Sequence, residues 1–84
     1  MKESDRRVLR AAAQAIDTSG GDWPGNDVIG EQMGGVDADL VADTLRAMHR
    51  AGHLKLDGAV NGGSGQAVFV QEITAKGRQA LGGR

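Results

Sequence analysis

The stretch AGHLKLDGAVNGGSGQAVFVQEITAKGRQAL, residues 51–81, places two short apolar runs on either side of a glycine-rich gap. Leu54 and Leu56 alternate with polar residues in the first run, and the second run, AVFVQEI at 67–73, is rich in residues that favour strands. Two such runs joined by a glycine-rich segment predict an antiparallel β-hairpin with residues 58–66 as its loop.

A helix is predicted on each side of this hairpin. Thr74 is a good cap for a last helix through about Leu81. Upstream, residues 37–50 carry the strongest helical pattern in the chain, with Asp37 as cap and Gly52 as the stop. The residues on its predicted apolar face recur at spacings of three and four: Leu40, Val41, Thr44, Leu45 and Met48.

Two more helices are expected before these. One covers about residues 4–17, where apolar residues recur on one side. The segment DTSGGDWPGN that follows is rich in turn-forming residues, so we expect a loop in which Trp23 forms a brief extended segment. A short helix, DVIGEQM at 27–33, comes next, with either Asn26 or Asp27 as its cap.

Composition limits the class of protein. The 84 residues suit a single domain spanning residues 1–84, with a thin core because the chain has one Phe, one Trp and no Tyr. The absence of cysteine excludes disulfides and thiolate chemistry and fits a reducing compartment. No apolar run is long enough to span a bilayer, so we expect a cytoplasmic protein with no membrane partner.

The charges are unevenly placed along a chain whose formal net charge is -1. Residues 1–10 hold four bases and two acids, whereas residues 11–36 hold four acids and no base. Residues 37–50 hold three acids and two arginines, and residues 51–84 hold four bases and two acids. Any basic face must therefore be assembled from the two ends of the chain.

The order of helices and hairpin resembles the winged helix-turn-helix superfamily. The likeness is specific in IGEQMGGVDADLVADTLRAMHRAGHL, residues 29–54, and in EITAKGRQAL, residues 72–81, which is similar to the segment after the wing in multiple-antibiotic-resistance and PadR-type regulators. Within the first segment, Gly35 corresponds to a one-residue insertion in the turn. The resemblance implies an α+β fold: a small winged helix-turn-helix with a three-helix core, a two-stranded β-hairpin wing and a short C-terminal helix.

The same resemblance implies a small DNA-binding transcriptional regulator or accessory protein, with double-stranded DNA as its partner. Helix 37–50 would then enter the major groove as the recognition helix. The groove-facing positions fall on Ala38, Asp39, Ala42, Asp43 and Arg46. The candidate DNA-binding residues are Arg46, Arg50, Lys55, Arg6, Arg7, Arg10, Lys76 and Arg78.

A second interpretation remains open, because two alanines and two aspartates are poor partners for bases and phosphates. In this alternative the chain is a protein-interaction winged helix that does not bind DNA and presents an acidic recognition-helix face to a basic protein partner. Its candidate residues are Trp23, Asp39 and Asp43. Trp is enriched at interface hot spots, although Trp23 also suits a simpler role in covering one end of the core.

No residues point to catalysis, and we expect neither enzyme activity nor a cofactor. His49 and His53 have the spacing of paired helical zinc ligands, but Gly52 is expected to break the helix between them, so no metal site is predicted. A monomer is slightly favoured over a homodimer, because the predicted elements leave almost no additional helix for dimerisation.

Overall fold

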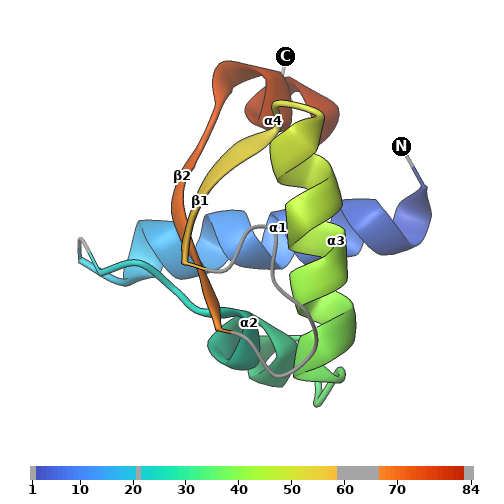
Figure 1. The fold of residues 1–84 in the computed structure, drawn as a ribbon. Helices are drawn as coiled ribbons and strands as arrows, with labels where there is room; N and C mark the ends of the chain where they lie inside the picture. The colour runs from blue at the N-terminus through green and yellow to red at the C-terminus, as the bar shows by residue number, and fades with distance from the viewer. Residues whose placement is uncertain (1, 21, 59–66, 83–84) are drawn as a thin grey trace.

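The computed structural model describes residues 2–20, 22–58 and 67–82 (Figure 1). The elements follow in the order α1 (Glu3–Thr18), α2 (Asn26–Gln32), α3 (Ala38–Arg50), β1 (Leu54–Gly58), β2 (Val68–Ile73) and α4 (Ala75–Ala80). They form the predicted α+β fold, in which three helices precede an antiparallel hairpin and a short helix follows it. The predicted hairpin loop lies, from residue 59 to residue 66, outside the described residues.

The core is small and mainly aliphatic. α1 runs behind α3 at a steep angle, and the hairpin lies beside α3 and also crosses α1 (Figure 1). The largest fully buried side chains come from the three helices and both strands: Leu9, Ile29, Val41, Leu45, Leu54, Val68 and Val70. Because α1 faces this core with alanines as well as Leu9, the other elements can approach it closely.

The prediction that Leu40 belongs to the apolar face of α3 is wrong, since Leu40 is 62% exposed. The buried stripe runs through Val41, Leu45 and Met48, which lie at spacings of three and four. Leu40 precedes this stripe by one position, about 100° around the helix, and so lies at its edge. The solvent-facing side of α3 therefore carries a large apolar residue.

Asn26 joins three elements through a buried side chain. Its Nδ2 donates to the carbonyl oxygen of Ala38 at 2.9 Å, and its Oδ1 accepts from the amide of Val68 at 3.2 Å. The predicted capping role of Asn26 is wrong, because α2 begins after Gly25 and the Asn26 side chain reaches towards α3 and β2 instead. One amide group thus connects the start of α2 with the starts of α3 and β2.

The segment before α2 adds a short third partner to the hairpin. The carbonyl oxygen of Pro24 accepts from the amide of Val70 at 2.9 Å, and Gly25 forms an antiparallel bridge with Phe69. The brief extended segment predicted at Trp23 is thus found at the next two residues, Pro24 and Gly25. It fixes the backbone next to Trp23 against β2.

α4 is attached to the junction between α3 and β1. The hydroxyl of Thr74 donates to the Gly52 carbonyl at 2.6 Å, and the Thr74 amide donates to the His53 carbonyl at 3.1 Å. The same hydroxyl accepts from the Gly77 amide at 3.2 Å, which confirms Thr74 as the cap of α4. Gly52 ends α3 as predicted, with a φ of 85° that favours glycine.

Replacing Asn26 by alanine is expected to destabilise the fold by about 2–3 kcal/mol, because the Val68 amide and the Ala38 carbonyl lose their buried partner. Urea unfolding followed by far-UV circular dichroism measures the loss. Gln14→Ala, on an exposed position of α1, serves as the control and should change stability by less than about 0.5 kcal/mol. Equal stability of the two variants would contradict the role of Asn26.

Gly77→Ala tests the docking of α4. Inside an exposed helix this change stabilises by about 1 kcal/mol. Here the added Cβ would fall on the His53 carbonyl oxygen and within 2.9 Å of Ile73 Cγ2. We therefore expect a loss of about 2 kcal/mol in urea unfolding. A stabilised Gly77→Ala protein would show that α4 does not pack as described, with Gln79→Ala as the neutral control on the same helix.

Candidate functional site

α3 is the helix that the resemblance places in a DNA groove. Of its five predicted groove-facing residues, Asp43 is exposed, whereas Ala38 and Asp39 are half-buried. Ala42 is only 1% exposed and Arg46 only 7% exposed. The prediction that all five lie on an exposed face is therefore wrong for Ala42 and Arg46.

The guanidinium of Arg46 is held against its own helix. Its Nη1 donates to Oδ1 of Asp43 at 2.8 Å, an ion pair between residues three apart. The Arg46 side chain is 8% exposed and that of Asp43 is 73% exposed. Arg46 is therefore buried apart from its contact with a carboxylate that lies at the surface. Arg46 could contact a phosphate only after leaving this arrangement, which leaves Arg50 as the exposed base of α3.

Three other candidate bases already have partners. Lys55 Nζ lies 3.1 Å from Glu72 Oε1 on the neighbouring strand, and Arg78 Nη2 lies 3.2 Å from Asp17 Oδ1. Lys76 Nζ donates to a main-chain carbonyl at the end of α3, 2.7 Å away. The two ion pairs are exposed, so each contributes at most about 1 kcal/mol and can rearrange when a partner binds.

Two bases of α1 lie beside the end of α2. Arg7 and Arg10 are exposed, form no ion pair with another described residue, and line a hollow beside Met33 at the end of α2. Arg50, in contrast, is at the end of α3 farthest from α2 (Figure 1). Arg7 also lines a hollow with Leu40 and Thr44 of α3, whereas neither Arg10 nor Arg50 does, so these three bases do not form one cluster at the start of α3.

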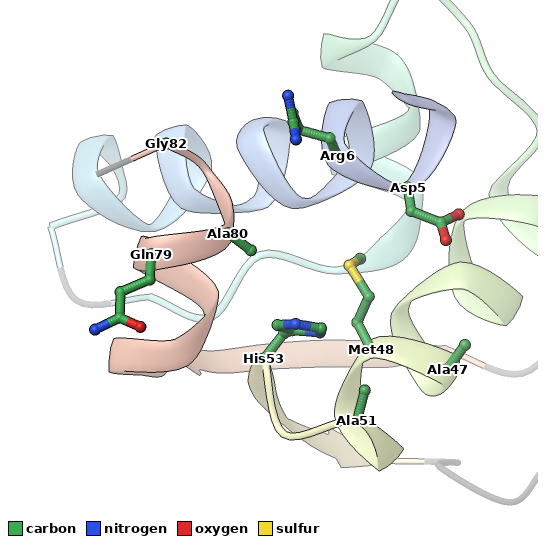
Figure 2. Close-up of a pocket in the computed structure, with 9 residues that line it drawn as sticks. All are labelled: Asp5, Arg6, Ala47, Met48, Ala51, His53, Gln79, Ala80 and Gly82. Carbon is green, nitrogen blue, oxygen red and sulfur yellow. The ribbon is translucent and has the colours of Figure 1, made fainter. Parts of the chain in front are cut away.

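Another hollow, of about 510 Å³, lies between α1, the end of α3 and α4 (Figure 2). It contains Arg6, whose Nε has no hydrogen-bond partner among the described residues, and His53, whose Nδ1 likewise has none there. Figure 2 shows the Arg6 side chain extending away from His53 and the Asp5 carboxylate pointing away from Arg6. These groups do not converge, so the hollow offers no arrangement of an acid, a base and a nucleophile.

The residues predicted for a protein partner separate into two places. Asp39 and Asp43 belong to α3, whereas Trp23 precedes α2 and lines a hollow with Val28 and Phe69. Trp23 is 50% exposed, so half of the residue's surface remains available for a partner. Trp23 and the acids of α3 therefore do not form one site.

Sequence reasoning missed Phe69 and Val28 as surface residues. The alternating burial of β2 turns Val68 and Val70 inward and Phe69 outward, so strand periodicity applied to AVFVQEI could have identified Phe69. The sequence offered no comparable signal for Val28. α2 has only seven residues, too few for a helical period to show that Ile29 and Gly30 are buried and Val28 is exposed.

The Nδ1 of His49 accepts from the Leu56 amide at 3.3 Å, which ties this side chain of α3 to β1. Within the described ranges, no group of three or more His, Asp or Glu residues is placed to hold a metal ion. None of the helices in the described part of the chain combines the length and apolar character that crossing a membrane requires.

The comparisons with known proteins provide no relative. No protein-family model matches the chain, and neither a curated protein nor a solved structure matches it.

Arg46→Ala is expected to destabilise the protein by about 2 kcal/mol, because it removes a buried side chain together with its ion pair. Arg50→Ala, at an exposed position of the same helix, should stay within about 0.5 kcal/mol of the parent. Urea unfolding of both variants measures the difference. If Arg46→Ala were as stable as Arg50→Ala, Arg46 would not have the structural role described.

Proposed function

We propose that this chain is a winged helix-turn-helix protein whose function is to bind another protein rather than to read DNA. The observation that carries the proposal is the burial of Arg46, the base in the middle of the recognition helix. A groove-reading helix needs exposed hydrogen-bond donors for base edges and phosphates. In α3 that donor is covered, and the neighbouring Ala42 is covered too.

The charges exposed on α3 also favour a protein partner over DNA. The exposed start of α3 carries Asp37, which caps the helix, and Asp43 lies nearly two turns further along. Duplex DNA carries one negative charge per roughly 1.7 Å of its axis, so carboxylates approaching it are repelled. A protein partner imposes no such requirement, and a basic one is attracted.

The apolar surface also supports a protein partner. Three of the large apolar residues exposed among the described residues, Trp23, Val28 and Phe69, line one hollow. Apolar groups grouped on a surface mark contact sites more often than isolated ones do, and a large aromatic residue is a frequent anchor. DNA phosphates gain nothing from such groups.

Duplex binding is the second candidate, favoured by one observation. Arg7, Arg10 and Arg50 are exposed and make no ion pair with another described residue, so they are available for phosphates. Three such contacts would give weak binding with a salt slope of roughly -3. This mode would use phosphates and little base recognition.

Titration with a mixed-sequence DNA duplex at low salt, followed by amide shifts in nuclear magnetic resonance spectra, separates the two candidates. We expect no salt-sensitive shifts along α3, because Arg46 is covered and Asp43 repels phosphate. Saturable shifts that disappear as salt rises, and that Arg50→Ala abolishes, would contradict the protein-binding proposal.

A positive test uses photo-crosslinking in nuclease-treated extracts of the cells that make the protein. A photoreactive residue at Trp23 or at Val28 should give a discrete protein adduct, because these side chains are exposed and line one hollow. The same residue placed at Gln14, on an exposed polar position, should not. The absence of a protein adduct at both apolar positions would count against the proposal.

A further inference from the structure

Three large apolar side chains meet on one side of the molecule. Trp23, Val28 and Phe69 are 50%, 41% and 39% exposed, and all three line a hollow of about 480 Å³. A second hollow, of about 540 Å³, shares Trp23 and Phe69 with the first and extends to Asp57. We call this surface the Trp23 face and define it by six residues: Trp23, Val28, Phe69, Asp22, Asp27 and Asp57.

The backbone beneath the Trp23 face is fixed. Pro24 is hydrogen-bonded to Val70, and Gly25 is bridged to Phe69. The Phe69 ring lies directly against Gly25, because a Cβ added there would stand 3.2 Å from Phe69 Cε1. The hydroxyl of Ser19 also donates to the Asp22 carbonyl at 2.7 Å. A surface already held in place needs less ordering when a partner binds.

The charged residues of the Trp23 face all have the same sign. Asp22 and Asp27 line the first hollow and Asp57 the second, and no Lys, Arg or His is among the described residues that line either one. None of these three carboxylates is within ion-pair distance of a base in the described ranges. The apolar residues are thus bordered by negative charge that the rest of the described structure does not neutralise.

We propose that the Trp23 face binds a peptide segment of another protein, in which a large aliphatic or aromatic side chain is flanked by Lys or Arg. The apolar side chain would rest between Trp23, Val28 and Phe69. The flanking bases would pair with the surrounding carboxylates, and a guanidinium can also stack on the exposed Trp ring. This inference rests on the proposed protein-binding function and assigns its site and the chemistry of its partner.

Charge distinguishes this partner from others that an apolar surface could attract. A second copy docking symmetrically through the same face would bring its own three carboxylates close to Asp22, Asp27 and Asp57, which is a contact between like charges. Anionic lipid and nucleic acid would be repelled by the same carboxylates. A basic peptide is the occupant that gains from both the apolar centre and the acidic border.

The chain provides its own reporter for this site, because Trp23 is its only Trp and it has no Tyr. Short peptides lacking Trp and Tyr are selected from a random displayed library against the full chain, and the enriched peptides are synthesised. We expect sequences with Leu, Met or Phe beside Lys or Arg, and a saturable change in Trp23 emission on binding. Versions with Glu in place of each base should not bind.

Matched variants locate the site. Asp22→Asn combined with Asp57→Asn should weaken peptide binding by roughly tenfold and reduce its salt dependence. Glu3→Gln combined with Asp5→Asn makes the same charge change on the first turn of α1 and should have no effect. Likewise Val28→Ser should weaken binding, whereas Leu40→Ser, at another exposed apolar position, should not.

Several results would overturn the inference. Peptides that bind but shift the amides of α3, leaving Trp23 emission unchanged, would retain the protein-binding function and reject this site. Enrichment of acidic peptides, binding of anionic vesicles, or Trp23 emission that changes with protein concentration alone would reject the proposed partner chemistry. No enriched peptide, together with salt-sensitive duplex binding by α3, would reject both proposals.

Discussion

The two hydrogen bonds of the Asn26 side chain are the constraint on which the rest of the structure depends. A buried amide must satisfy both its donor and its acceptor, and Asn26 does so with the carbonyl of Ala38 and the amide of Val68. Because these groups begin α3 and β2, the position of α2 fixes the positions of both. The Pro24–Gly25 backbone is then held beside β2, which brings Trp23 and Phe69 to the same surface.

A second junction fastens the other end of the hairpin. Thr74 donates to the carbonyls of Gly52 and His53, which follow α3, while its hydroxyl also caps α4. Gly77 allows α4 to approach the His53 carbonyl more closely than any residue with a Cβ could. Asn26 therefore holds one end of the hairpin, and Thr74 and Gly77 hold the other. The thin core fills the space between these two junctions.

The sequence was sufficient to predict the elements whose cause is local. The cap at Asp37, the stop at Gly52, the cap at Thr74 and the two strands all follow from residues near one another in the chain. The role of Asn26 was not predictable in the same way, because its acceptor and donor partners lie 12 and 42 residues away. From the sequence alone, Asn before a helix indicates a cap.

The candidate site was less predictable for the same reason. Helical periodicity placed Leu40 inside and Arg46 outside, but the actual rotation of α3 is decided by what packs on it, and both side chains have the opposite exposure. Trp23 was identified as an exposed anchor in one interpretation, yet its neighbours Val28 and Phe69 come from elements whose approach depends on the junction at Asn26. Residue types predict chemistry, whereas the site requires their tertiary placement.

Hydrogen exchange of the Val68 amide in the native protein tests this junction most directly. Val68 is the first residue of β2, a position at which an amide bonded only to a fraying strand exchanges quickly. If Asn26 holds the junction, the Val68 amide exchanges as slowly as the amide of Leu45 in the core of α3. Exchange much faster than that of Leu45, with β2 otherwise protected, would contradict the central role of Asn26.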